Sequence, residues 1–230
     1  MLGLAPRLVN VLKEQGITDP TPIQTQAIPH AMNGRDVMGL AQTGTGKTAA
    51  FGVPLIARML DYGRKPAAHT VRGLVLAPTR ELANQIAATL KDLTEGTPMK
   101  IGLVVGGVSI NPQIQRISRG TDILVATPGR LLDILDRKAL DLGSCDFLVL
   151  DEADQMLDLG FIHALRKISA LLPEERQTML IVTHEMQFAR EIADRVVFME
   201  GGRIVEQGPP TQIFDAPQDP RTRAFLRRVG

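Results

Sequence analysis

Short apolar runs recur along the chain and alternate with segments of helical periodicity. Each run is continuously apolar, which is typical of parallel strands buried on both faces. The runs lie at Val37–Leu40, Gly73–Leu76, Ile101–Val105, Asp122–Val125, Phe147–Leu150 and Thr178–Val182. Between them, apolar residues recur every three or four positions over 82–93 and 161–172, as in amphipathic helices. The pattern predicts an α/β fold with a mainly parallel sheet flanked by helices.

The two ends of the chain have a different character. Near the start, Pro20, Pro22 and Pro29 are expected to divide the N-terminal segment into helices and loops that cap the sheet. Near the end, two strand-like runs surround a Gly-Gly pair within 196–206, which predicts a β-hairpin. A short helix around 212–214 and a basic helix over 221–228 are expected to follow.

Composition bounds the class of protein without identifying it. The 230 residues suit one α/β domain, and 44% hydrophobic with 22% charged residues is ordinary for a globular protein. A net charge of +1 gives no general attraction to nucleic acids or membranes, so any such site must be local. Cys145 is the only cysteine and is expected to be a small packing residue in a reducing, cytoplasmic setting.

The first chemical pattern is a glycine-rich turn that follows the first apolar run and precedes a helical segment. Backbone N–H groups in such a turn, the helix N-terminus and a lysine together make a polyphosphate cradle. The cradle is expected to comprise Thr43, Gly44, Thr45, Gly46, Lys47 and Thr48. Lys47 would lie along the β- and γ-phosphates, and the Thr48 hydroxyl would bind Mg²⁺. The alternative is a turn that merely contains glycines, and its place between a strand and a helix argues against that.

An acidic cluster, Asp151-Glu152-Ala153-Asp154, follows the apolar run at 147–150. A carboxylate at the C-terminal end of a buried parallel strand lies at the sheet edge where ligands bind. Asp151 fits a ligand of Mg²⁺, through water, and Glu152 fits a base that orients or deprotonates an attacking water. Alone, such a cluster is usually a solvated helix start, but together with the glycine-rich turn it predicts a nucleotide site.

Residues 2 to about 180 resemble the first RecA-like domain of a DEAD-box RNA helicase. The motifs that carry the resemblance are Thr21-Pro22-Ile23-Gln24, Ala41–Thr48, Pro78–Ala83, Gly106-Gly107, Thr127-Pro128-Gly129-Arg130 and Asp151–Asp154. The resemblance implies a RecA-like P-loop NTPase fold that binds ATP or ADP with Mg²⁺. It also implies that Gln24 hydrogen-bonds adenine.

The same resemblance implies a second site, for RNA phosphates. Its residues would be Arg80, Gly107, Thr127 and Arg130. The alternative, of comparable weight, is that these residues only begin helices and form tight turns.

From about Ile181 the chain instead resembles the C-terminal end of an ABC transporter ATPase of the polar amino-acid uptake type. The supporting stretches are Val182–Met186, Ala193–Val196, Met199–Gly208 and Thr222–Leu226. We therefore expect an engineered chimera, in which 1–180 and 181–230 form one hybrid P-loop domain. The strand at 178–182 should lie between the strand before Asp151 and the P-loop strand, and Val196–Met199 should flank the P-loop strand on its other side. His184 would face the γ-phosphate; the alternative is a surface histidine at a helix N-terminus.

The resulting prediction is a domain that binds ATP or ADP with Mg²⁺, hydrolyses ATP slowly or not at all, and does not unwind RNA. An arginine finger is typically worth ~10³–10⁵ in rate, and the resemblance implies that helicases receive theirs from a second domain, which we do not find in this chain. Any slow ATPase activity would depend on Lys47, Glu152 and His184. Two alternatives stay open: a residual RNA-binding helicase fragment, or a stable chimera without activity.

Overall fold

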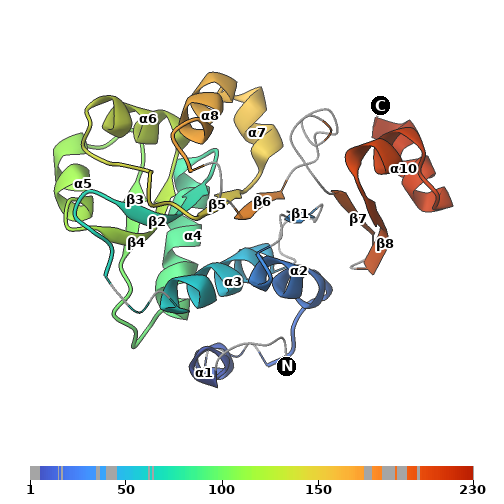
Figure 1. Cartoon of the computed structure of the whole chain (residues 1–230), viewed down its shortest axis with the longest axis horizontal. Coiled ribbons are helices and arrows are strands. Elements are labelled where there is room, and N and C mark those ends of the chain that lie inside the picture. Colours follow the sequence, from blue (N-terminus) through green and yellow to red (C-terminus); the bar gives the residue numbers. More distant parts are fainter. Residues whose placement is uncertain are drawn as a thin grey trace.

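The protein is built around one eight-stranded sheet (Figure 1). The computed structural model describes residues 6–14, 16, 18–34, 37–39, 46–61, 63, 65–173, 178–182, 190, 196–200 and 203–229. The strands are β1 (Val37–Gly39), β2 (Val71–Leu76), β3 (Ile101–Val104), β4 (Thr121–Ala126), β5 (Phe147–Leu150), β6 (Thr178–Val182), β7 (Val196–Glu200) and β8 (Arg203–Gly208). Their order across the sheet is β3-β4-β2-β5-β6-β1-β7-β8. All neighbouring strands are parallel except β7 and β8, which form an antiparallel hairpin.

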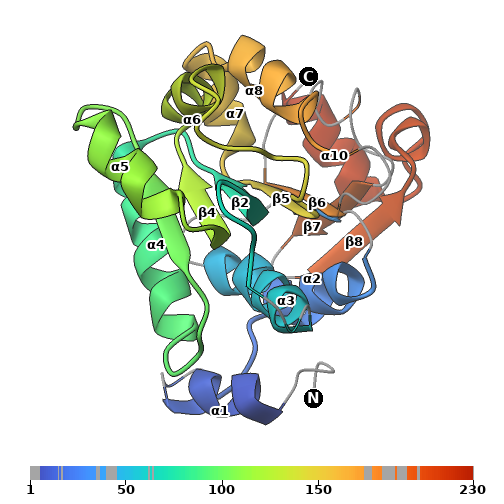
Figure 2. The ribbon, with the colours of Figure 1, turned by 60° about the vertical axis from the view of Figure 1, so that its left-hand side comes forward.

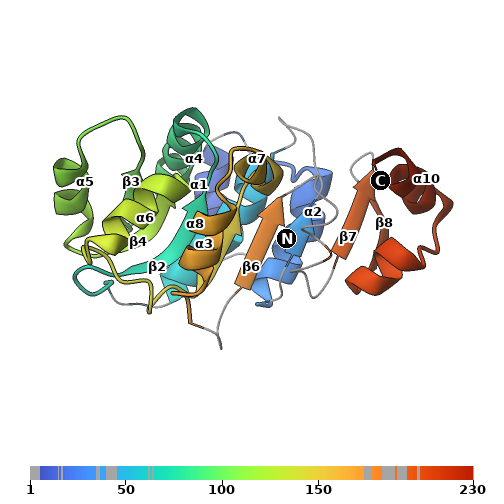
Figure 3. The ribbon, with the colours of Figure 1, turned by 90° about the horizontal axis from the view of Figure 1, so that it is seen from above.

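The predicted strand order around β1 is confirmed. Strand β6 lies between β5 and β1, where it pairs Val37 with Leu180. On its other side β1 pairs with β7, through Gly39 and Val197. The segment beyond residue 180 therefore completes the sheet next to the strand that leads into the glycine-rich turn. Figure 3 shows the β7–β8 hairpin at the end of the sheet opposite β3.

Helices cover both faces of the sheet, which gives the layers seen in Figure 2. On one side lie α1 (Pro6–Glu14), α2 (Pro22–Met32), α3 (Lys47–Asp61) and α4 (Arg80–Leu93). On the other lie α5 (Ile110–Ile117), α6 (Pro128–Asp136), α7 (Ala153–Asp158) and α8 (Ile162–Ser169). The C-terminal segment adds a π-helical turn, η1 (Thr211–Asp215), and α10 (Pro220–Val229). These ranges agree closely with the two helices expected from the sequence.

Alternate residues of the central strands enter two separate hydrophobic cores. In β5, Phe147 and Val149 pack with α1–α4, whereas Leu148 and Leu150 pack with α5–α8. This division explains why the strands are apolar at every position, since neither face meets water. Cys145 is buried in the second core, as predicted for a packing residue, and burial raises the pKa of its thiol to about 12.

One expectation about the N-terminal segment is wrong. Pro29 does not break this segment but lies inside α2. Because proline has no N–H, one hydrogen bond inside the helix is lost. The helix continues because Ala27, Ile28 and Ala31 bury their side chains against the core, and tertiary packing of this kind outweighs local propensity. Pro22, by contrast, occupies the first turn of α2, where a missing donor is harmless.

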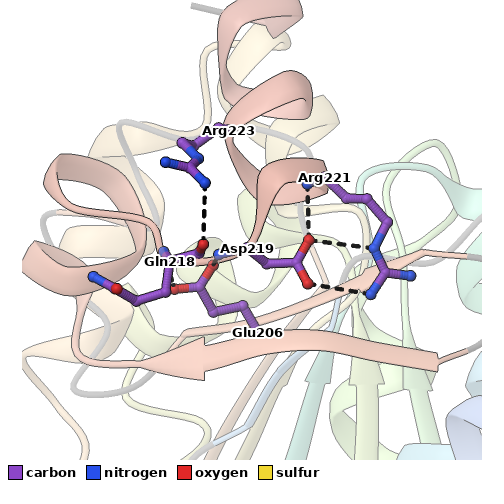
Figure 4. A network of polar contacts seen from close by, with 5 residues as sticks. All are labelled: Glu206, Gln218, Asp219, Arg221 and Arg223. Carbon is purple, nitrogen blue, oxygen red and sulfur yellow. Dashed lines mark hydrogen bonds and ion pairs between the residues drawn. The ribbon is translucent and has the colours of Figure 1, made fainter.

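A buried carboxylate fastens the C-terminal segment to the sheet. Glu206 of β8 accepts hydrogen bonds from the backbone N–H groups of Gln218 (2.8 Å) and Asp219 (3.0 Å), as Figure 4 shows. Burial would raise the pKa of Glu206, but these two N–H groups and the side chains of Thr222 and Gln212 lower it below its usual value. The ionised carboxylate is thus the form that the fold selects.

The same hydrogen-bond network includes the residues at the start of helix α10. Asp219 accepts hydrogen bonds from the backbone N–H and the guanidinium of Arg221, which lower the pKa of the Asp219 carboxyl. Behind the network, the rings of Phe198 in β7 and Phe225 in α10 lie 4.8 Å apart. Helix α10 is therefore held to the hairpin by both polar and aromatic contacts.

We predict that Glu206→Gln loosens α10 from the hairpin. An amide offers one acceptor oxygen where the carboxylate offers two, so a backbone donor is left unpaired at a cost of about 1–3 kcal/mol. Because the pKa of Glu206 is lowered in the folded state, its contribution is present above the ordinary carboxyl pKa and is lost as pH falls through the folded value. Urea unfolding and amide exchange at Gln218 and Asp219 measure both effects. The exposed neighbour Gln207, changed to alanine, is the control; unchanged exchange at the two amides would contradict the prediction.

Candidate functional site

The glycine-rich turn ends at a residue that has to be glycine. Gly46 has φ +83°, in the left-handed region, and immediately precedes Lys47, the first residue of α3. A Cβ on Gly46 would collide with the side-chain amide nitrogen of Gln24. Lys47 and Thr48 are half-buried in the first turn of α3, where free backbone N–H groups favour an anion. The predicted residues Thr43, Gly44 and Thr45 lie outside the described part of the chain.

Gln24 joins the start of α2 to the glycine-rich turn. Its side-chain nitrogen donates to the Gly46 carbonyl at 3.1 Å, and its side-chain oxygen accepts from the Thr21 backbone N–H at 3.1 Å. Gln24 is buried, so this amide is fixed at both of its polar atoms. The predicted adenine-binding residue and the phosphate-binding turn are therefore parts of one connected structure.

Asp151 lies at the carboxyl end of β5, on the same sheet edge as the glycine-rich turn. Its backbone N–H donates to the Leu76 carbonyl at 3.0 Å, which fixes the turn after β5 to the end of β2. Burial raises the pKa of the Asp151 carboxyl to about 6; the positive charge of Lys47 lowers it, and the carboxylates of Glu152 and Asp154 raise it. The structure thus brings Lys47 and Asp151 within electrostatic range, as the two motifs predicted.

Glu152 adopts a backbone conformation that is rare for a residue with a side chain. Its φ and ψ are 55° and 53°, in the left-handed region, and it precedes the first residue of α7. Such geometry costs of order 1–3 kcal/mol and is found most often at functional sites. It turns the chain between Asp151, at the end of β5, and the start of α7.

Three buried oxygens of the predicted motifs have no hydrogen-bond partner among the described residues. They are Thr21 Oγ1, Asp151 Oδ1 and Asp154 Oδ1. Buried polar atoms are normally paired, so these oxygens suit a bound ligand, ion or water. The described residues contain no cluster of three or more His, Cys, Asp or Glu side chains that could hold a metal alone. One carboxylate with a hydroxyl fits Mg²⁺, because this ion usually completes its shell with phosphate oxygens and water.

The predicted RNA residues also meet at the carboxyl edge of the sheet, beyond β5. Arg80 is exposed at the start of α4, whose N-terminus is capped by the Thr79 hydroxyl accepting from the Leu82 N–H at 3.2 Å. The Arg80 guanidinium lies against Gly107, which has φ +75°. A Cβ on Gly107 would collide with that guanidinium, so glycine is required here by both conformation and space.

Thr127 and Arg130 belong to the start of α6. The buried Thr127 donates its backbone N–H to the Val104 carbonyl at 3.1 Å, which joins the ends of β3 and β4. Arg130 donates from Nη1 to the Val108 carbonyl at 2.8 Å. Arg80 and Arg130, from different helices, therefore both contact the loop 105–109, and the four predicted residues lie in one region.

The sequence pattern did not single out Gln113, and the predicted position of His184 is not tested by the structure. The Gln113 side chain makes three hydrogen bonds within the loop 105–109. A signal was present: in α5, Gln113 occupies the apolar stripe of Ile110, Ile114 and Ile117, where a polar residue has to find buried partners. His184 lies outside the described residues, as does most of the segment 183–195.

The sheet and the motifs at its carboxyl edge first define the class of protein. A mainly parallel sheet carries a glycine-rich turn after β1 and an acidic turn after β5, with a third strand inserted between them, as in RecA-like nucleotide-binding domains. A family model for the DEAD/DEAH box helicase matches residues 21–183. The chain therefore belongs to the DEAD/DEAH box helicase family.

Curated relatives agree with the family model. DEAD-box ATP-dependent RNA helicases named CshA, from Bacillus cereus, Bacillus thuringiensis and Bacillus anthracis, are each 42% identical to this chain over 194 residues. The match covers 84% of this chain and 36% of each relative, so the chain spans about a third of their length. No comparison supports the predicted fusion with an ABC transporter ATPase or the predicted lack of activity. In the described part of the chain, no helix is long and apolar enough to cross a membrane.

We predict that the Asp151 carboxyl titrates near pH 6. Its raised pKa means that the stability due to this group is fully present below about 3.8 and is lost as pH rises through about 6, a change of about 3 kcal/mol at 1.36 kcal/mol per unit. Asp151→Asn should remove this part of the pH dependence of unfolding. Lys47→Met should raise the pKa of Asp151 further, as followed by carbon-13 NMR, whereas Lys13→Met, at an exposed position of α1, should not. Titration of Asp151 near pH 4 would contradict this.

Proposed function

We propose that this chain binds ATP or ADP with Mg²⁺ at the carboxyl edge of β1, β5 and β6, and binds RNA phosphates at the neighbouring edge. The observation that carries the proposal is the hydrogen bond from Gln24 to the Gly46 carbonyl. It connects the predicted adenine-binding residue to the turn that precedes Lys47, and Lys47 interacts electrostatically with Asp151. The residues proposed to bind the base, the phosphates and the metal ion are thus connected through these contacts.

Each predicted residue has a role in this proposal. Thr43, Gly44, Thr45 and Gly46 supply backbone N–H groups to the phosphates, and Lys47 neutralises their charge. Thr48 and Asp151 hold Mg²⁺, which, when bound, offsets negative charge on the phosphates. Glu152 orients a water molecule at the γ-phosphate, and His184 contacts that phosphate. Because Asp151 is easily protonated near pH 6, magnesium binding is expected to improve above that pH.

RNA binding rests on the second group of residues. Arg80 and Arg130 present guanidinium groups beside Gly107 and Thr127, where backbone donors of a tight turn and a helix start also lie. Guanidinium and backbone N–H groups are the usual donors to nucleic-acid phosphates. Because the chain spans about a third of its curated relatives, their ATP-dependent RNA helicase activity is a proposal for this chain. The rate of ATP hydrolysis by the chain alone is expected to be low.

The origin of residues 181–230 is a separate and finer proposal. The resemblance to an ABC transporter ATPase remains a prediction from the sequence, and the family match ends at residue 183. A strand β7 that flanks β1, followed by the β8 hairpin, is compatible with it. Replacing residues 181–230 with the corresponding segment of a CshA protein tests the idea. If the present segment is foreign to the helicase part, the replacement should leave ATP binding intact.

We predict that ADP with Mg²⁺ binds more tightly than GDP with Mg²⁺, as measured by calorimetry. Lys47→Met should weaken both nucleotides by at least about tenfold, or 1.4 kcal/mol, because a phosphate partner is lost. Gln24→Glu should weaken ADP selectively, since it keeps an acceptor for Thr21 but loses the amide donor. Gln85→Glu, an exposed change in α4, is the matched control. Equal affinities for ADP and GDP would count against adenine recognition.

We predict that Arg80→Ala and Arg130→Ala each weaken binding of single-stranded RNA. Each change should also reduce the salt dependence of binding by about 0.7 in the slope of log K against log salt, because one phosphate contact is lost. Filter binding at salt concentrations from about 50 to about 200 mM measures both the affinity and the salt slope. Arg58→Ala, at an exposed position of α3, serves as the charge-matched control. If all three variants behave alike, RNA binding is nonspecific charge attraction.

A further inference from the structure

The loop 105–109 between β3 and α5 is the meeting point of the two candidate RNA-binding arginines. Arg80 lies against Gly107, and Arg130 donates to the Val108 carbonyl at 2.8 Å. The loop is exposed at its tip, where Val108 is 48% exposed. A loop with a glycine pair and an exposed tip needs an internal support to keep one conformation.

Gln113 provides that support from inside the protein. Its side-chain oxygen accepts from the Val105 N–H at 2.8 Å, and its side-chain nitrogen donates to the carbonyls of Val105 (3.2 Å) and Ser109 (3.0 Å). One amide therefore spans the loop from its first residue to its last. Gln113 is only 5% exposed, so these bonds are shielded from competing water.

The position of Gln113 in α5 indicates that its amide serves the loop. Ile110, Ile114 and Ile117 on the same stripe pack against the second core. An apolar residue at 113 would suit that core as well, yet it would leave the Val105 N–H and two carbonyls without this partner. The polar side chain thus serves the loop and not the packing of the helix.

We propose that Gln113 is a positioning residue for RNA-phosphate binding, a role that rests on the proposed function. Gln113 does not touch RNA itself. It fixes the Val105 and Ser109 ends of the loop, and so fixes Gly107 under the Arg80 guanidinium and the Val108 carbonyl opposite Arg130. Two cationic groups from separate helices are thereby kept at one spacing, as binding to successive phosphates requires.

The test compares Gln113→Met with Gln115→Met, an exposed change in the same helix. Gln113→Met should weaken binding of a single-stranded RNA about tenfold and lower the salt slope by about 0.7 to 1.4, although it removes no charge. Affinity for ADP with Mg²⁺ should stay unchanged, which also reports that the variant is folded. Gln113→Asn, which keeps the amide but shortens its reach, should give a smaller loss. Gln115→Met should match the unaltered protein.

A double-mutant cycle separates positioning from general destabilisation. In a chain that already carries Arg80→Ala and Arg130→Ala, Gln113→Met should cause no further loss of RNA affinity. A full additional loss there, or an unchanged salt slope, would overturn the proposal. A measurement without RNA adds a further test. Amide exchange at Val105 should be slow in the unaltered protein and fast in Gln113→Met; fast exchange in the unaltered protein would also overturn the proposal.

The outcomes distinguish this inference from the proposed function. If the arginine variants weaken RNA binding and Gln113→Met does not, only the role of Gln113 is wrong. If the arginine variants have no effect beyond that of Arg58→Ala, the RNA site itself is wrong and the role of Gln113 is wrong with it.

Discussion

The structure depends on the enclosure of a very short strand between two parallel neighbours. Strand β1 has three residues, too few to be stable by itself, and it is held by β6 on one side and β7 on the other. Because Gly46 and Lys47 follow β1 in the sequence, this pairing helps to set where these two residues lie relative to Asp151. The C-terminal segment, which supplies β7, therefore supports the strand that leads to the proposed nucleotide site, although it lies far from Lys47 in the sequence.

A second constraint is the common direction of β1 to β7. Parallel strands bring all their carboxyl ends to one edge, so residues separated by more than a hundred positions become neighbours there. Gln24 reaches Gly46, Lys47 influences Asp151, and loops from β2, β3 and β4 gather around Gly107. The proposed nucleotide and RNA groups occupy adjacent stretches of this edge, which meet where β5 lies beside β2. The Asp151 N–H donating to the Leu76 carbonyl is a direct physical link between the two stretches.

The sequence was sufficient for features that depend on local pattern. The continuous apolar runs located β2 to β6 to within one or two residues, and the hairpin and final helix were found from turn residues and periodicity. It was insufficient where distant contacts decide. Pro29 stays helical because its neighbours are buried, and Glu206 is ionised in a buried place because Gln218 and Asp219 approach it in space. Gln113 was visible only as a polar residue out of pattern, and its partners required the fold. The predicted ABC-type origin of the tail has no support from the comparisons, and 42% identity to CshA proteins identifies the helicase family alone.

The contact between Arg130 and the Val108 carbonyl has a chemical consequence for which side chain can stand there. A guanidinium carries five N–H donors in a rigid plane, so one of them can hold the loop while others remain available to an oxyanion. An ammonium group has three donors but no rigid plane, so a hydrogen bond from lysine to the carbonyl would not fix the direction of its other donors. In the proposed RNA-binding role, one arginine would therefore hold the loop of the free protein and also contact a phosphate, with its orientation set before RNA binds.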